Sequence, residues 1–187
     1  FYGADRIPSD ALWLRAIRSP HHHATFELGD LEAFRRAHPG LTYILSARDI
    51  PLNAFGIYPD IKDQPALADG VVRFRGEAVI ALVGLRTVIE AIDEQTLPIR
   101  WTPLDAVMGL DAAMDPAAAQ VLPNRPGNLL QDGGVRCGDT ASALSACAAV
   151  VEGEFETTFV EHAYIEPEAG WAQRVGEGHA AELHVHV

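Results

Sequence analysis

The stretch Val71–Val83, VVRFRGEAVIALV, contains the pattern that decides the fold class. Val71–Phe74 and Ala78–Val83 are rich in apolar and β-branched residues, and the turn-forming sequence Arg75-Gly76-Glu77 separates them. This arrangement predicts two β-strands. Every residue of the second strand is apolar, so both of its faces must be covered in the folded protein. We therefore expect Ala78–Val83 to be the central strand of a sheet.

Strand and helix patterns alternate on the N-terminal side of this stretch. A helix is expected over Asp30–Ala37, because Asp30 is a good N-cap residue and His38-Pro39-Gly40 ends the pattern. Further strands are expected at Ala11–Arg18, Ala24–Leu28 and Leu41–Leu45. Ile50–Gly70 contains three prolines and little periodicity, so we expect a long loop there, a feature that is more often functional than idle.

The C-terminal side continues the alternation and then changes character. We expect a helix over Arg86–Glu94, a strand over Leu97–Trp101 and a short helical piece over Pro103–Met114. Asp115–Gly134 has three prolines, three glycines and two asparagines, which makes it the best linker candidate. Beyond it we expect a helix over Ala141–Ala148 capped by Asp139, and strands over Val150–Phe159 and Glu182–Val187. Together these elements predict an α+β fold.

The composition limits the partners and the compartment. The chain of 187 residues has 14 basic and 26 acidic side chains and a net charge of −12, so nucleic acid is an unfavourable partner. No apolar run approaches the roughly 20 residues that a membrane span needs. The two cysteines, Cys137 and Cys147, have no CxxC spacing, so we expect neither a disulfide framework nor an iron–sulfur cluster. A cytoplasmic protein fits these features.

The histidines do not form a convincing metal site in the sequence. His21-His22-His23 is a consecutive run, and on a strand only His21 and His23 would share a face. Two imidazoles without a third ligand at suitable spacing make a poor zinc site, and His184 and His186 repeat that arrangement. We expect no metal site and no catalytic residue in this chain.

Five motifs, in order, resemble one enzyme family. They are RSPHHHA at Arg18–Ala24, HPGL and SARDIP within His38–Pro51, DQPALA at Asp63–Ala68, VRFRGEAV at Val72–Val79, and VEGEFET with EHAYIEP within Val151–Pro167. Each is weak alone, but their order across nearly the whole chain resembles the large molybdopterin-binding polypeptide of the xanthine dehydrogenase/aldehyde oxidase family. The resemblance identifies the chain as an N-terminal fragment of such a polypeptide.

The resemblance implies a domain organisation. Residues 1–114 would form an α/β hammerhead domain with a curved mixed sheet. Residues 115–136 would be a linker, and residues 137–187 would begin a truncated molybdopterin-binding domain. The charge distribution changes in the same region, since nine carboxylates follow Cys137 against Arg174 alone.

The resemblance also implies an activity that these residues would not perform by themselves. Family members are molybdenum-dependent oxidoreductases that hydroxylate an N-heterocycle or an aldehyde with oxygen from water. Their cofactor is molybdopterin, expected here in its cytosine dinucleotide form, and electrons pass to [2Fe–2S] and FAD partner domains or subunits. The family's glycine-rich segment and catalytic glutamate would follow Val187, so we expect this fragment alone to be inactive.

Two sets of residues are site candidates, the first implied by the resemblance and the second suggested by the residue types themselves. Phe55 and Leu67 would line a substrate channel, within a loop over Phe55–Ala68. Glu161, His162 and Glu166 look like an acid–base cluster, but we expect them to form a structural junction in which His162 and a carboxylate make a buried hydrogen-bonded pair.

Several alternatives stay open in the sequence. The chain could instead be a non-catalytic interaction or assembly module that docks onto iron–sulfur and flavin partners. The terminal strand Glu182–Val187 would leave an open sheet edge, which favours a homodimer. The substrate, the electron acceptor and the fusion or separation of the subunits are not specified.

Overall fold

The computed structural model describes residues 3–56, 62–158, 160–165, 168–178 and 181–187. The chain divides into two compact units, one formed by Asp10–Asn128 and the other by Phe1–Ser9 together with Leu129–Val187. The division falls between Asn128 and Leu129, while the domain ranges expected from the sequence remain a prediction. Within the described residues, no helix is long and apolar enough to cross a membrane.

The Asp10–Asn128 unit is built around a three-stranded sheet with β5 (Ala78–Gly84) at its centre, as expected from its sequence. The strand β1 (Trp13–Arg18) pairs antiparallel with one edge of β5 and β3 (Leu41–Leu45) with the other. Four consecutive residues of β5, from Val79 to Leu82, are buried. Side chains alternate between the faces of a strand, so both faces of this sheet are covered.

A second three-stranded sheet supplies more of the same core. It consists of β4 (Val71–Val72), β2 (Ala24–Leu28) and β6 (Ile99–Pro103), with β2 in the middle. Phe26 of β2 lies opposite Trp101 of β6, and their rings are 5.4 Å apart. Ala24, Phe26 and Val72 belong to the same buried cluster as Ile80 and Leu82, so the two sheets share one hydrophobic core.

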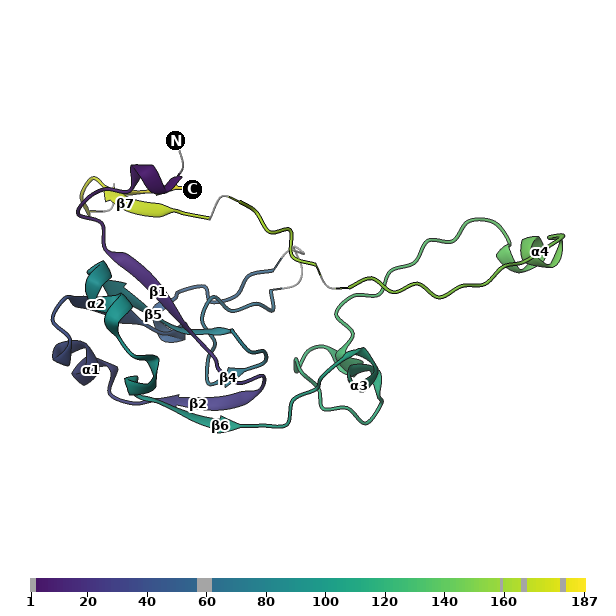
Figure 1. Cartoon of the computed structure of the whole chain (residues 1–187), viewed down its shortest axis with the longest axis horizontal. Coiled ribbons are helices and arrows are strands. Elements are labelled where there is room, and N and C mark those ends of the chain that lie inside the picture. Colours follow the sequence, from purple (N-terminus) through teal and green to yellow (C-terminus); the bar gives the residue numbers. More distant parts are fainter. Residues whose placement is uncertain (1–2, 57–61, 159, 166–167, 179–180) are drawn as a thin grey trace. The chain divides into compact units, whose positions relative to one another are not determined.

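Short helices pack against the first sheet (Figure 1). The helix α1 (Leu31–Ala37) begins at Asp30, whose side chain accepts a hydrogen bond from the Ala33 N–H. The helix α2 (Arg86–Ala91) follows β5 directly. Arg15 of β1 donates to the carbonyls of Ile89 and Ile92, at 2.8 and 2.9 Å. Because the last carbonyls of a helix have no partner within it, Arg15 ties the end of α2 to the sheet.

The remaining regular elements of this unit are short. The helix α3 (Leu110–Met114) lies in the segment after β6, and 3₁₀ turns occur at Ala47–Asp49, Glu94–Thr96 and Pro126–Asn128. In the first of these turns Asp49 accepts hydrogen bonds from the Ser46 N–H and hydroxyl, both at 2.8 Å. These bonds hold the pKa of the Asp49 carboxyl below its usual range.

A close backbone approach fixes the join between β5 and β3. A Cβ atom added to Gly84 would lie 2.3 Å from the Gly40 carbonyl oxygen and 3.0 Å from the Leu41 Cα. Only a residue without a side chain fits there.

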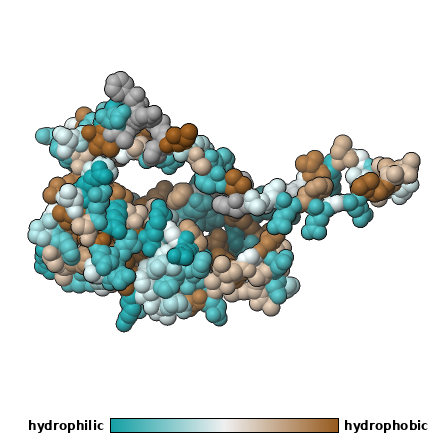
Figure 2. Space-filling model, in the orientation of Figure 1, coloured by the Kyte–Doolittle hydropathy of each residue, from teal (hydrophilic) through white to brown (hydrophobic). Residues whose placement is uncertain are grey.

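The second unit has little packing. Its elements are the 3₁₀ turn Gly3–Arg6, the helix α4 (Thr140–Ser145) and a hairpin of β7 (Trp171–Val175) with β8 (Glu182–His186). Asp139 caps α4 as expected, and the hydroxyl and N–H of Ser142 lower the pKa of its carboxyl. From Leu129 to Val187 no described residue is buried. Figure 2 shows hydrophobic residues at the surface around α4.

The expected α+β class is confirmed, but three details of the prediction are wrong. Every strand pairing in the described residues is antiparallel, so the expected single mixed sheet is replaced by separate antiparallel sheets. The expected strand Val150–Phe159 is absent from its described residues, 150–158, because no described segment pairs with it. The helix expected over Pro103–Met114 is reduced to α3, since Pro103 instead pairs with Ala24 at the end of β6.

Candidate functional site

The loop after the Ala47–Asp49 turn is closed at its base by one side chain. The Asn53 side-chain amide donates to the Leu67 carbonyl at 2.7 Å, and its oxygen accepts from the Ala66 and Leu67 N–H groups at 2.9 and 3.1 Å. Phe55 and Gln64 then exchange two backbone hydrogen bonds, at 2.8 and 2.9 Å. These bonds satisfy backbone groups that would otherwise lack partners. They hold the two ends of the loop together at its base.

The two channel candidates differ in exposure. Leu67 is 6% exposed and its backbone is held by Asn53, whereas Phe55 is 53% exposed. Both residues belong to the loop base, but only the Phe55 side chain is exposed to solvent. Residues 57–61, within the expected channel loop, lie outside the described residues. The channel role of both residues stays a prediction.

Glu161 and His162, the two junction candidates among the described residues, do not form a buried pair. Glu161 and His162 are both exposed, and the Glu161 carboxylate accepts a hydrogen bond from the His162 backbone N–H at 3.0 Å rather than from its ring. The His162 ring stacks on Tyr164, with ring centres 5.8 Å apart. Glu166 lies outside the described residues. A structural junction at these residues stays a prediction.

The histidine run does not form a metal centre. Within the described part of the chain, no three His, Cys, Asp or Glu side chains are grouped so that they could hold a metal ion. The His21 ring contacts Trp101 edge-on at 5.5 Å, and the His23 Nδ1 donates to the Asp105 carbonyl at 2.7 Å. His184 is 3.1 Å from Glu182, and His186 stacks on Trp171. These contacts give the imidazoles structural partners.

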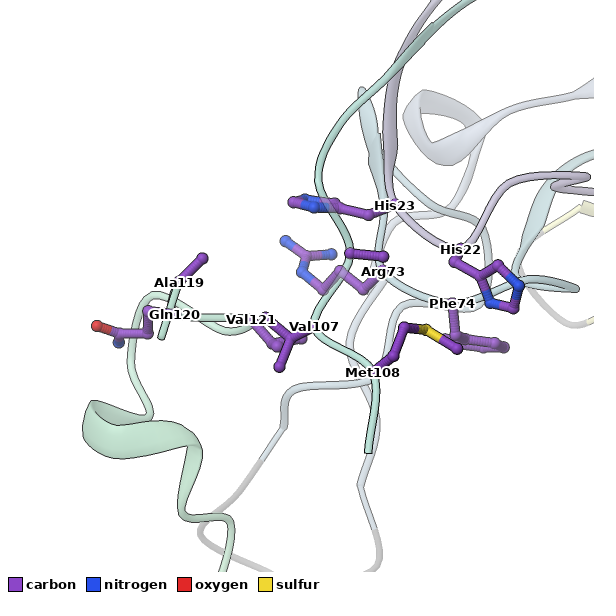
Figure 3. A pocket seen from close by; sticks show the side chains of 10 residues that line it. His22, His23, Arg73, Phe74, Val107, Met108, Ala119, Gln120 and Val121 are labelled. Carbon is purple, nitrogen blue, oxygen red and sulfur yellow. The ribbon is translucent and has the colours of Figure 1, made fainter. Parts of the chain in front are cut away.

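A small pocket in the Asp10–Asn128 unit was not predicted. Its volume is about 150 Å³, and His22, His23, Arg73, Phe74, Met108 and Val121 are among the residues that line it (Figure 3). We call it the Arg73 pocket. Its lining comes from four separate segments of the chain, so no local sequence pattern could have indicated it.

The described residues of the second unit do not enclose a site for a large cofactor. A pterin with its phosphates needs enclosing backbone and converging polar groups. From Leu129 to Val187, however, the described residues are exposed except for Ala169, Trp171 and Ala181, which are half-buried. A Cβ atom at Gly133 or Gly134 would meet nothing within 4 Å, so no close cradle surrounds these glycines. The described residues of this unit therefore do not enclose such a group on their own.

Comparison with known proteins shows which proteins are similar to this chain in sequence and in fold. A family model described as the molybdopterin cofactor-binding domain matches residues 121–187. The nicotinate dehydrogenase large molybdopterin subunit of Eubacterium barkeri is 33% identical over 181 residues, which cover 95% of this chain and 41% of that protein. A probable xanthine dehydrogenase subunit of Bacillus subtilis is 27% identical over 169 residues, covering 89% and 22%.

A solved structure extends the likeness to three dimensions. Quinoline 2-oxidoreductase from Pseudomonas putida 86 aligns with a TM-score of 0.52 and 30% identity, over 64% of this chain and 16% of that one. The chain thus spans less than half the length of each relative. Likeness across 95% of this chain in sequence and 64% in structure supports one conclusion. The chain belongs to the xanthine dehydrogenase/aldehyde oxidase family of molybdopterin-binding polypeptides.

Proposed function

We propose that the chain works as part of a molybdenum hydroxylase larger than these 187 residues, which hydroxylates an N-heterocycle or an aldehyde with oxygen from water. The observation that carries this proposal is the 33% identity, over 95% of the chain, to a nicotinate dehydrogenase subunit. The molybdopterin cofactor, in its cytosine dinucleotide form, would supply the oxygen-transfer chemistry. Iron–sulfur and FAD domains or subunits would accept the electrons.

The packing of the chain supports different roles for its two units. The Asp10–Asn128 unit has a closed hydrophobic core, and we assign to it the role of a hammerhead-type domain that carries the Phe55–Ala68 loop toward the substrate. Residues 137–187 would start the cofactor domain. Because none of the described residues from Leu129 to Val187 is buried, we expect this part to complete its fold only against further protein, and the chain alone to be inactive.

The test compares the 187-residue chain with the complete polypeptide. Both are produced in cells that make the molybdenum cofactor, and molybdenum and pterin are measured in each purified protein. We expect about one molybdenum per complete polypeptide, and transfer of ¹⁸O from labelled water into nicotinate or another N-heterocycle. Stoichiometric molybdenum in the 187-residue chain would contradict the assignment, and so would a complete polypeptide without molybdenum.

A non-catalytic assembly module is the second candidate, and one observation favours it. The described large apolar side chains between Leu129 and Ile165 are exposed, with Val151, Phe155 and Ile165 at 93%, 94% and 100%. Exposed apolar groups of this kind are typical of binding surfaces. Such a module would bind the iron–sulfur and flavin proteins without molybdenum. Co-purification of those partners with a molybdenum-free complete polypeptide would favour this candidate.

A further inference from the structure

The Arg73 pocket has a charge opposite to that of the protein. The whole chain has a net charge of −12, yet the pocket is lined by one arginine and two histidines, and by no carboxylate. A cavity with one sign of charge concentrates ligands of the other sign. The lining therefore favours an anion over a neutral or cationic ligand.

Arg73 is held in place by its backbone while its guanidinium stays unpaired. The Arg73 N–H donates to the buried Glu77 carboxylate at 2.6 Å, and the Ser19 N–H donates to the Glu77 carbonyl at 2.8 Å. Among the described residues, no acceptor bonds the Arg73 guanidinium, although the residue is half-buried. A guanidinium has five N–H donors in a planar fork that matches a carboxylate, so a bound carboxylate would satisfy it.

His23 forms the wall beside this cation. Its Nδ1 donates to the Asp105 carbonyl at 2.7 Å, which fixes the ring and ties the segment after β6 to the start of β2. In Figure 3 the Arg73 guanidinium and the His23 ring extend in the same direction, with Val107 and Val121 below them, whereas Met108, Phe74 and His22 lie on the other side of the pocket. Apolar side chains therefore lie both below the guanidinium and across the pocket from it.

The apolar part specifies the rest of the ligand. Phe74, Met108 and Val121 are 58%, 60% and 37% exposed, so their side chains leave apolar surface that a ligand could cover. Pockets that bind small molecules combine such apolar walls with a few polar groups that fix orientation. We propose that the Arg73 pocket binds a small organic carboxylate, with its carboxylate on the Arg73 guanidinium and a flat apolar body against Phe74, Met108 and Val121.

Fluorine NMR of 4-fluorobenzoate titrated with the purified 187-residue chain tests this proposal, because it needs neither molybdenum nor turnover. We expect saturable binding, and Arg73→Gln should weaken it about 10- to 100-fold, since a hydrogen bond to a charged group contributes that much. The matched control is Arg75→Gln, which removes an exposed arginine from the same turn and should leave binding unchanged. Val121→Asp places a carboxylate in the pocket without changing Arg73 and should also abolish binding, whether or not Arg73→Gln folds.

Two competitors define the ligand class. Benzoate should displace the probe, and benzamide, which has the same shape without the charge, should do so at least about tenfold less well. Inorganic phosphate, which lacks an apolar body, should also be a poor competitor. Absence of saturable binding would overturn the proposal, as would equal binding by Arg73→Gln and Arg75→Gln. Equal competition by benzamide or by phosphate would overturn it as well.

Discussion

Replacement of Gly84 by alanine should test the geometry that joins β5 to β3. Alanine is favoured over glycine in a strand by about 0.5–1 kcal/mol when there is room for its methyl group. Here the new Cβ would lie 2.3 Å from the Gly40 carbonyl oxygen, so the two backbones must separate. Backbone shifts caused by overpacking cost about 1–3 kcal/mol. We therefore expect a net loss of at least about 1 kcal/mol in the free energy of unfolding.

Urea denaturation followed by tryptophan fluorescence measures this loss directly. Trp13 pairs with Gly84 in the sheet, and Trp101 contacts the core residue Phe26, so both report on unfolding of the Asp10–Asn128 unit. The control is Gly134→Ala, where the added atom meets nothing within 4 Å and the change should stay within about 0.5 kcal/mol. If Gly84→Ala were as stable as the natural protein or more stable, the close approach would be refuted.

Three further predictions concern other contacts. Arg15→Met should destabilise the Asp10–Asn128 unit by about 1–3 kcal/mol in urea, because two carbonyls at the end of α2 lose their donor. Arg100→Met removes only an exposed ion pair and should cost less than about 0.5 kcal/mol. Equal losses of unfolding free energy in Arg15→Met and Arg100→Met would contradict the role given to Arg15. Asp49→Asn should flatten the dependence of the melting temperature on pH below about pH 4. The lowered pKa of the Asp49 carboxyl means that its ionised form contributes stability above the unfolded-state pKa of about 3.9, which is lost as the pH falls through the folded-state pKa. An unchanged pH profile would exclude that contribution. In the complete enzyme, Phe55→Ala should raise KM for substrate without lowering the melting temperature, whereas Leu67→Ala should cost about 2–5 kcal/mol of stability because Leu67 is buried. An unchanged KM and substrate preference in Phe55→Ala would end its channel role.

The sequence predicted the elements that local patterns specify. Ala78–Val83 was correctly placed at the centre of a sheet, because a strand that is apolar at every position must be covered on both faces. The helices capped by Asp30 and Asp139 begin where those side chains accept backbone hydrogen bonds. Each of these signals lies within a few residues of the element that it defines.

The errors came from features that depend on distant residues. The alternation in Val150–Phe159 predicts a strand, but a strand also needs a partner for its backbone groups, and no described residue supplies one. β7 was missed because only its pairing with Glu182–His186 makes Trp171–Val175 a strand. The pairing direction, which decides between mixed and antiparallel sheets, is not specified by the alternation of side chains.

The site candidates show the same dependence on distance along the chain. Phe55 and Leu67 came from an alignment, which indicates a position but not its exposure, and the structure separates the two residues in that respect. The Asn53 bonds to Ala66 and Leu67 span 13 and 14 residues. The Arg73 pocket joins segments that only the folded sheets bring together. No short motif contains either arrangement.

The contrast between the two units bears on the proposed function. Val151 and Phe155 are spaced for one face of a strand, yet they are 93% and 94% exposed. Burial of a side chain of this size is favourable by about 1.5–3 kcal/mol. Other large apolar side chains after Leu129, such as Val135 and Ile165, are also exposed, so several such contributions are unused. The Asp10–Asn128 unit, by comparison, buries its apolar strand residues within its own core. The second unit therefore needs more apolar surface to pack against. This need is consistent with the length of the relatives, which are more than twice as long as this chain. A cofactor that needs an enclosed site would have to be bound where that additional surface closes over these residues.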